Sequence, residues 1–315
     1  MPWVVAGAST TGPAHRHADL PCADAHACLT LGDLAILVVC DGAGSASHGC
    51  EGALLVAAEL SRQAESWYRA ITPDATAPNE AAPNAAAPNA AAPNAAAPNA
   101  AAPNAAAPNA AAPNAAAPNA AAPNAAAPNA AAPNEAALAT LTDETLGSWF
   151  LAARTALAGQ AEVAATAIGR YHCTAILVLA SPTATVAAHI GDGVAITFHQ
   201  NHQPESWRVL SWPDQGQFVG ETVFVDDADL GRDLRISRTG GTKAVVAASD
   251  GFDPFVVQHA QRRVLPHQVE PLRQALAGGD PTTCWDEPLA QFIGHEAFDA
   301  HADDDRTLVI AVWRE

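Results

Sequence analysis

The sequence predicts an α+β fold in which antiparallel β-sheets pack with a few helices. Many short apolar runs lack helical spacing, which is typical of buried strands. A few longer segments have helix-forming composition, and strands and helices do not alternate strictly along the chain. Two apolar runs end in Asp-Gly, at Asp41 and Asp250, and a third follows the aspartates at 303–305. These acids are the first indication of where the chemistry lies.

The first half of the chain is expected to contain a hairpin, a loop and two helices. Its expected elements are strands over 3–6, 26–30 and 34–41 and helices over 51–67 and 138–167. Gly32-Asp33 supplies the turn of the hairpin. The His-, Gly- and Pro-rich stretch 10–25 is expected to be a loop.

The second half is expected to contain most of the strands. The expected elements are strands over 173–180, 185–190, 194–199, 207–211, 243–250 and 308–313, and short helices over 253–264, 269–277 and 287–297. Gly191-Asp192-Gly193 is a strong turn signal and predicts a hairpin between the strands on either side. Residues 212–229 are expected to form an irregular surface lobe, with Asp226-Asp227-Ala228-Asp229 as a solvated turn.

Residues 77–134 are a low-complexity Ala-Ala-Ala-Pro-Asn repeat. Proline at every fifth position would cost a helix about 3 kcal/mol each time, and nothing large and apolar is available for burial. We expect a disordered, partly polyproline-II insertion, arising from a neutral repeat expansion. The remaining chain is long enough for one well-packed domain, so 1–315 is predicted to be a single domain interrupted by the repeat.

Composition excludes several classes of function. The formal net charge of −18 argues against nucleic acid and anionic membranes as partners. No apolar run reaches the length of a membrane span and the start lacks a basic, then apolar leader, so a cytoplasmic protein is expected. The six cysteines include no CxxC pair and are expected to be reduced thiols, with Cys40 and Cys173 in the core.

The aspartates next to the apolar runs predict a metal site. In an antiparallel sheet, the end of one strand and the start of its neighbour share a rim, so Asp41, Asp250 and Asp304 can converge. Burying an unpaired carboxylate is costly, and a cation is the simplest compensation. Carboxylates without nearby His or Cys suit Mg²⁺ or Mn²⁺ better than Zn²⁺.

Four motifs follow one another along the chain. They are Asp41-Gly42-x-Gly44, Gly191-Asp192-Gly193, Ser249-Asp250-Gly251-Phe252 and Asp304-Asp305-Arg306-Thr307. Their order and strand context resemble the type-2C (PPM) metal-dependent Ser/Thr protein phosphatases. Further segments are similar to a bacterial branch of that family: Gly12-x-x-His15, Pro21-Cys22-Ala23-Asp24-Ala25 and Gly220-Glu221-Thr222-Val223-Phe224. The resemblance covers the chain except for the repeat.

The resemblance implies an α-β-β-α sandwich of two antiparallel sheets flanked by helices, with two divalent ions at one end. Asp41 would bridge both ions and Gly42 would offer its backbone carbonyl. Asp250 and Asp304 would complete the shell of one ion. Asp24 would hold the second ion, directly or through water.

The resemblance also implies a role for Asp192, which would support the rim and help to hold a weaker third ion. The expected catalytic residues are Asp41 and Asp250. Two ions about 3.5–4 Å apart can activate a shared water and clamp the phosphoryl oxygens for in-line attack. The expected reaction is hydrolysis of phosphoserine and phosphothreonine in a protein substrate of a Ser/Thr kinase pathway.

The chain departs from the family pattern at three positions. Asp19 stands where many members carry a phosphate-binding Arg, which leaves His15 or Arg16 as substrate-binding replacements. Ala23 replaces the usual Gln or Glu, and Ala43 stands where some members have a His. Two alternatives therefore remain open: a catalytically weak phosphoprotein-binding scaffold with the same fold, and a phosphatase for a small phosphate ester.

Overall fold

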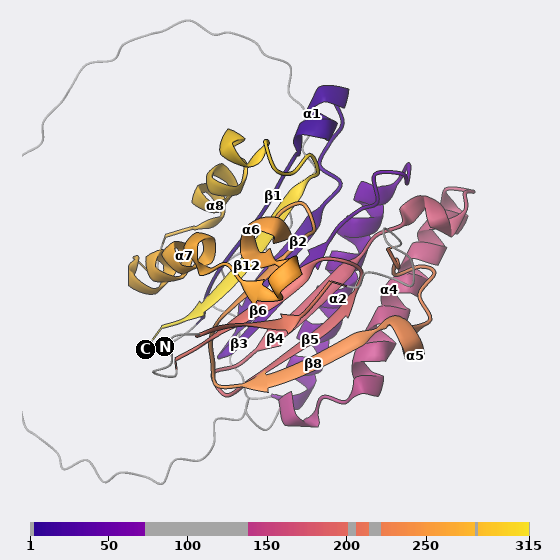
Figure 1. The fold of residues 1–315 in the computed structure, drawn as a ribbon. Coiled ribbons are helices and arrows are strands. Elements are labelled where there is room, and N and C mark those ends of the chain that lie inside the picture. The colour runs from indigo at the N-terminus through magenta and orange to yellow at the C-terminus, as the bar shows by residue number, and fades with distance from the viewer. Residues whose placement is uncertain (1–2, 73–137, 201–205, 214–221, 281–282, 315) are drawn as a thin grey trace, which may run out of the picture. The chain divides into compact units, whose positions relative to one another are not determined.

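Two five-stranded antiparallel sheets lie face to face between helices (Figure 1). The computed structural model describes residues 3–72, 138–200, 206–213, 222–280 and 283–314. The strand order of the first sheet is β1-β12-β9-β6-β7 and that of the second is β2-β3-β4-β5-β8. This architecture confirms the predicted α+β class and the α-β-β-α sandwich. The expected repeat over 77–134 lies outside the described residues.

The bounds of the elements follow the chain. The first sheet contains β1 Trp3–Thr10, β6 Val194–His199, β7 Trp207–Ser211, β9 Thr242–Ala248 and β12 Arg306–Trp313. The second contains β2 Ala25–Leu31, β3 Leu34–Cys40, β4 Ala175–Ala180, β5 Ala184–Ile190 and β8 Arg235–Gly240. The main helices are α2 Gly49–Ile71, α4 Asp143–Val163, α7 Pro266–Gly278 and α8 Asp286–Ile293, and α1 Pro13–Ala18, α5 Leu230–Asp233 and α6 Asp253–Val256 are short.

Three apolar layers hold the sandwich together, and β3 shows how one strand serves two of them. Ile36, Val38 and Cys40 pack against α2 and α4. Their neighbours Leu37 and Val39 face the other sheet. A strand places successive side chains on opposite faces, so a strand buried on both sides must be apolar throughout, as its sequence indicated. The third layer packs α7 and α8 against the first sheet.

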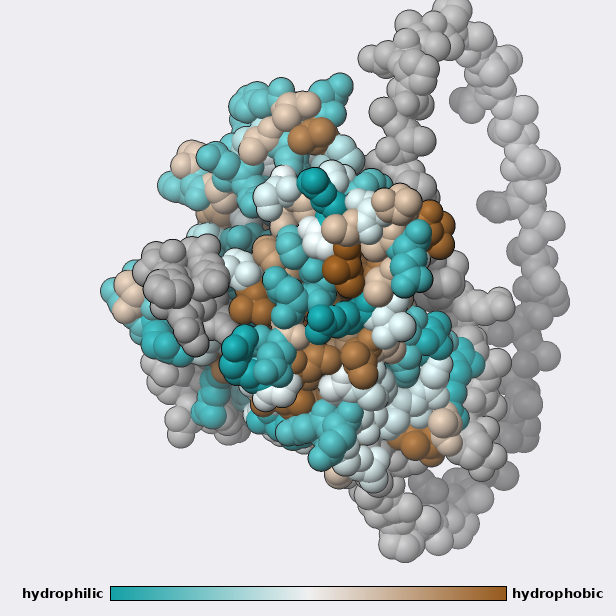
Figure 2. All heavy atoms as spheres, turned by 90° about the vertical axis from the view of Figure 1, so that its right-hand side faces the viewer, coloured by the Kyte–Doolittle hydropathy of each residue, from teal (hydrophilic) through white to brown (hydrophobic). Residues whose placement is uncertain are grey.

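On one side of the molecule, the apolar surface is divided into separate patches. Figure 2 shows the side of the molecule that lies at the right in Figure 1, with hydrophilic residues at the centre of the face and hydrophobic patches around them. Among the described helices, none combines the length and apolar character needed to cross a bilayer.

Cys40 and Cys173 are fully buried, which confirms their predicted place in the core.

Several element predictions are wrong at the amino terminus. The expected loop 10–25 contains α1, which begins with Pro13 and ends at the left-handed residue Asp19. The first strand continues to Thr10 instead of ending at residue 6, because each of its residues pairs with one on β12, from Trp3 with Trp313 to Thr10 with Arg306. That partner strand lies about 300 residues further along the chain, so no local sequence pattern indicates the pairing.

Other predictions are wrong in the second half. The expected helix 253–264 is only α6, followed by the two-residue strands β10 Val257–Gln258 and β11 Arg263–Val264. The helix ends early at the consecutive β-branched residues Val256 and Val257, where Val257 is already extended. The expected helices 138–167 and 287–297 shorten to α4 and α8. The polar strand β8 was not predicted, because it is an edge strand whose residues are all partly or fully exposed and follow no apolar pattern.

The predicted hairpin at Gly191-Asp192-Gly193 does not form. The strands on either side, β5 and β6, do not pair with each other. β5 pairs with β4 and β8 in the second sheet, whereas β6 pairs with β7 and β9 in the first. The turn therefore carries the chain from one sheet to the other, and Asp192 lies where the two sheets meet.

Candidate active site

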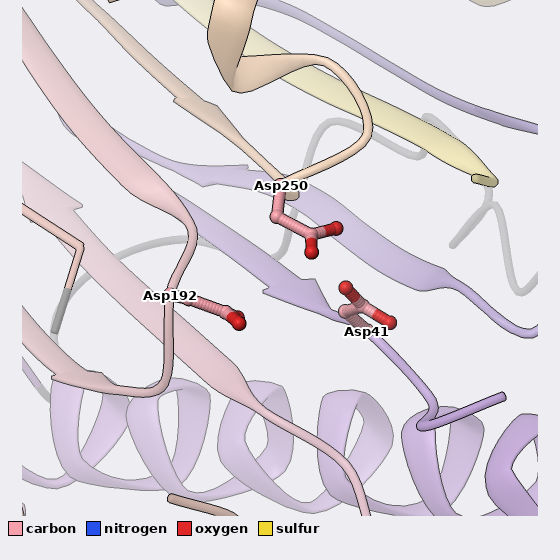
Figure 3. A group of neighbouring side chains, drawn as sticks. All are labelled: Asp41, Asp192 and Asp250. Carbon is pink, nitrogen blue, oxygen red and sulfur yellow. The ribbon is translucent and has the colours of Figure 1, made fainter. Parts of the chain in front are cut away.

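Asp41, Asp192 and Asp250 lie together at one end of the two sheets. One carboxylate oxygen of each lies within 4.8 Å of the others. Asp41 follows β3 in the second sheet, Asp250 follows β9 in the first, and Asp192 lies on the turn between the sheets. Figure 3 shows the three side chains directed toward one another from these separate strand ends. The site thus depends on how the two sheets stack.

Thr174 joins the strand end of Asp41 to the turn that carries Asp192. The backbone N–H of Thr174 donates to the carbonyl of Asp41 over 2.8 Å, and its Oγ1 accepts from the N–H of Asp41 over 3.3 Å. A Cβ on Gly191 would lie 2.4 Å from Cβ of Thr174, and Gly191 has φ +109°. Glycine is therefore required at 191 both for its backbone conformation and for this close contact.

Gly42 is similarly confined next to Asp41. A Cβ at this position would lie 2.4 Å from the carbonyl oxygen of Gly49 and 2.6 Å from that of Ala23. Gly42 also bridges Cys173 across an isolated antiparallel pair. The backbone of Gly42, whose carbonyl was expected to be a metal ligand, is thus fixed close to the loop that leads to Asp24.

Asp24 lies close to Asp41 and Asp250 and is nearly fully buried. Oγ of Ser249 donates to Oδ2 of Asp24 over 2.8 Å. Loss of contact with water raises the pKa of Asp24 to about 8, with a contribution from the carboxylates of Asp305 and Asp250. The hydrogen bond from Ser249 acts in the opposite direction.

The same two causes act on Asp41 and Asp250. Loss of contact with water, followed by repulsion from Asp24 and Asp250, raises the pKa of Asp41 well above its ordinary value. Loss of contact with water raises the pKa of Asp250 to about 6, with repulsion from Asp192 and Asp304 adding to it. Carboxylates gathered without a counter-charge favour protonation, and a bound cation would reverse that preference.

Asp304 is exposed and does not belong to the group within 4.8 Å, among the residues that the structure describes. It lies close enough to raise the pKa of both Asp41 and Asp250. Its Oδ1 accepts the backbone N–H of Asp305 over 2.8 Å. The structure thus brings Asp304 to the edge of the cluster, while Asp192 lies inside it.

His15 faces the active-site loop and is held there by Asp305. Nδ1 of His15 lies 2.7 Å from Oδ2 of Asp305, which is buried and also accepts the backbone N–H groups of Gly12 and Ala23. Nε2 of His15 lies 4.0 Å from the position of a Cβ on Gly44. Asp305 thereby fixes the loop, a role that the motif Asp304-Asp305-Arg306-Thr307 did not indicate.

Arg16 is engaged elsewhere. Its guanidinium lies 2.5 Å from Oδ2 of Asp299 and donates to the carbonyl of Thr11 over 2.6 Å. Asp299 also pairs with the buried Arg306. Arg16 therefore helps to hold α1 against the segment before β12, and the structure does not bring it to the acidic cluster.

Two further acids, Asp226 and Asp253, are buried next to histidines. Asp226 was expected in a solvated turn, but it is buried and its Oδ2 lies 2.8 Å from Nδ1 of His172. Burial raises the pKa of Asp253 to about 7, and its Oδ2 lies 3.0 Å from Nε2 of His259. Each imidazole supplies the hydrogen bond that makes burial of the carboxylate tolerable.

The cluster fits a divalent cation. Oδ1 of Asp250 is buried and has no hydrogen-bond partner among the described residues. The donors are hard carboxylate oxygens, with no imidazole or thiolate in the group. Such a set suits Mg²⁺ or Mn²⁺ by charge and by ligand type.

Comparisons with known proteins point to one family. A model of the protein phosphatase 2C family matches residues 11–279. Serine/threonine-protein phosphatase 3 of Escherichia coli (strain K12) is 24% identical over 323 residues, and the match covers 100% of both chains.

Solved structures are similar at the level of the fold. The catalytic domain of the serine/threonine protein phosphatase PstP in complex with 2 manganese ions gives a TM-score of 0.55 at 13% identity, covering 99% of each chain. Serine/threonine phosphatase Stp1 from Staphylococcus aureus gives 0.53 at 15% identity, covering 99% of this chain and 95% of that one.

Proposed function

Because the chain belongs to the protein phosphatase 2C family, we propose that it hydrolyses phosphoserine and phosphothreonine in proteins with the aid of divalent ions. The observation that carries the proposal is the meeting of Asp41, Asp192 and Asp250 within 4.8 Å from three distant parts of the chain. Their shared position, and the raised pKa values of Asp41 and Asp250, support a site built for cations.

The proposed ligands are Asp24, Asp41, the carbonyl of Gly42, Asp250 and Asp304, with Asp192 helping to hold a third ion. Two Mg²⁺ or Mn²⁺ ions, when bound, would acidify the attacking water and neutralise charge on the phosphate. Asp41 and Asp250, from different sheets, would fix the spacing of the ions. Ser249 would hold Asp24 in the orientation that its hydrogen bond now gives it.

His15 is the proposed contact to the phosphate in place of the missing arginine. Asp305 accepts from Nδ1, so Nε2 is directed at the loop of Gly44. Arg16 is not needed for this role, because Asp299 and Thr11 already occupy its guanidinium.

The proposed partner is a phosphoprotein from a Ser/Thr kinase pathway.

We also propose that residues 1–315 form one phosphatase domain interrupted by 77–134. Strand β3, before the repeat, pairs with β4, after it. Strand β1 pairs with the carboxy-terminal β12 in the same way. Neither sheet would be complete with only one side of the insertion, which supports a single folding unit.

The test is phosphate release from phosphoserine and phosphothreonine peptides and, in parallel, from small phosphate esters. Activity on the peptides should vanish in chelator and return with Mn²⁺ or Mg²⁺. Asp41→Asn and Asp250→Asn should each lower activity by at least about 100-fold, since they remove ligands rather than supporting groups.

Asp143→Asn is the matched control, because Asp143 is exposed and pairs with Arg238 away from the cluster. It should leave activity within about twofold of the parent. Full activity in both ligand variants would exclude the proposed centre. Turnover of small esters alone would change the substrate class, and binding of phosphopeptides without turnover would favour the scaffold alternative.

A further inference from the structure

We propose that Thr222 is a positioning residue that fixes Asp192 for metal binding, and that residues 223–226 hold Thr222 in place. The inference rests on the proposed metal centre but concerns a residue with no role in it so far. Thr222 belongs to the motif Gly220-Glu221-Thr222-Val223-Phe224, which the structure describes from Thr222 onward. The proposed role explains why a hydroxyl stands at this position of the motif.

The central contact is one hydrogen bond. Oγ1 of Thr222 donates to Oδ2 of Asp192 over 2.6 Å. This hydrogen bond involves Oδ2 of Asp192 and not Oδ1. In Figure 3 the Asp192 side chain is directed toward Asp41 and Asp250, so one carboxyl group can serve both the hydroxyl and the cluster.

Asp192 needs such support because it lies on the turn between the sheets. Its neighbours in the cluster follow strands that are paired on both sides, β3 and β9. The turn itself is held at Gly191, whose carbonyl accepts from the guanidinium of Arg235 over 2.7 Å. That bond fixes the backbone but leaves the torsions of the Asp192 side chain free, and Thr222 restricts them.

Thr222 can do so because the residues after it are fixed beside the active site. The backbone N–H of Val225 donates to the carbonyl of Cys173 over 2.9 Å. Asp226 pairs with His172 over 2.8 Å, and the ring of Phe224 stacks on that imidazole with centroids 4.7 Å apart.

Residues 172 and 173 lead directly to Thr174, which is bonded to Asp41. One end of the segment 222–226 therefore contacts Asp192, while the other is fixed to residues 172 and 173, next to the Thr174 that bonds Asp41. This arrangement presents the hydroxyl of Thr222 in a preorganised direction, which is what an outer ligand-supporting group requires.

The competing explanation is that Thr222 only stabilises the turn. A structural role predicts a change in stability without a change in metal affinity. A positioning role predicts weaker metal binding that depends on Asp192. Thr222→Val preserves the side-chain shape but cannot donate, whereas Thr222→Ser retains the hydroxyl, so the two substitutions separate these explanations.

The experiment is calorimetric titration of metal-free protein with Mn²⁺, with no substrate present. The parent protein, Thr222→Val, Thr222→Ser, Asp192→Asn and the double variant Thr222→Val/Asp192→Asn are compared. Binding that disappears in Asp192→Asn is assigned to Asp192. Thermal unfolding in chelator checks that each variant is folded.

We expect Thr222→Val to weaken the Asp192-dependent binding by about 10-fold or more, and Thr222→Ser to stay within about threefold of the parent. In the Asp192→Asn background, Thr222→Val should cause no further loss, because its effect passes through Asp192. Parent-like affinity in Thr222→Val, or additive losses in the double variant, would overturn the inference alone. A parent protein that binds no Mn²⁺ would overturn both the inference and the proposed function.

Discussion

Oγ of Ser249 donates to Oδ2 of Asp24 over 2.8 Å, although 225 positions separate the two residues. Oγ of Ser249 also accepts the backbone N–H of Thr307 over 2.9 Å. One buried hydroxyl thus joins the end of β9, the start of β12 and the loop before β2. These are the segments that deliver Asp250, Asp304 and Asp24 to one place.

Ser249→Ala should lower the free energy of unfolding of the metal-free protein by about 1–3 kcal/mol, because the N–H of Thr307 and the carboxyl of Asp24 both lose a buried partner. Urea denaturation in chelator measures the change. Ser61→Ala is the control, since the hydroxyl of Ser61 donates to the carbonyl of Ala57 within its own helix, and this substitution should cost no more than about 0.5 kcal/mol. Equal effects at the two positions would contradict the joining role of Ser249.

The metal-free protein should lose stability as the pH rises from about 7 to about 8. Burial raises the pKa of Asp24 to about 8 and holds that of Asp41 well above 3.8, so the folded state retains protons that the unfolded chain has released. The free energy of unfolding therefore falls with rising pH in this window. The buried His189, whose pKa is lowered, acts in the opposite sense only below its ordinary value of 6.5.

Calorimetric melting temperatures at the two ends of that window, with and without Mn²⁺, measure this pH effect. Bound cation should flatten the dependence, because it favours the ionised carboxylates in the folded state. Asp24→Asn should remove part of the slope in chelator. If the metal-free protein becomes more stable over the same interval, the prediction is wrong. The buried carboxyl groups would then have a compensating partner in solution.

His15→Ala should lower kcat/KM on a phosphopeptide by about 10-fold or more, because it removes the side chain that faces the loop of Gly44. Arg16→Ala should change the same constant by less than about twofold, since an exposed pair with Asp299 contributes little. Steady-state kinetics on both variants make the comparison. A larger loss in Arg16→Ala than in His15→Ala would transfer the phosphate contact to the arginine.

Gly191→Ala should destabilise the protein by about 1–3 kcal/mol from its positive φ alone, and further from the contact with Thr174. The displaced turn should also weaken Mn²⁺ binding. Gly159→Ala is the control, because that glycine lies in α4 with nothing within 4 Å of an added Cβ. It should stabilise the protein by about 0.5–1 kcal/mol, as alanine favours helix. Thermal unfolding measures both changes in stability. The prediction is contradicted if both substitutions shift the melting temperature in the same direction.

The buried strands were predictable because their chemistry is local. Strand β3 is apolar at every position since both of its faces are covered, and the strand ends at Asp41 because a carboxylate cannot continue into that interior. The hairpin with β2 was equally predictable, as Gly32 provides the left-handed turn residue. The polar edge strand β8 carried no such signal.

The position of Asp192 could not be predicted in the same way. Gly191-Asp192-Gly193 has the composition of a hairpin turn, and the choice between pairing β5 with β6 and separating them depends on β4, β8, β7 and β9. The sequence showed that this aspartate followed a strand. It did not show that the turn crosses between the sheets and so completes the cluster with Asp41 and Asp250.

The sequence by itself determined the fold class, the buried strands, the acids at their ends and the resemblance that the family match confirms. The tertiary structure alone decided that Asp192 joins Asp41 and Asp250, that Asp305 holds His15, and that Arg16 is bound to Asp299 instead of facing the site. The physical reason is that apolar periodicity and turn composition act between neighbouring residues. Which strand ends meet is decided by pairing and stacking between segments far apart in the chain, and the side-chain contacts of the site follow from that stacking.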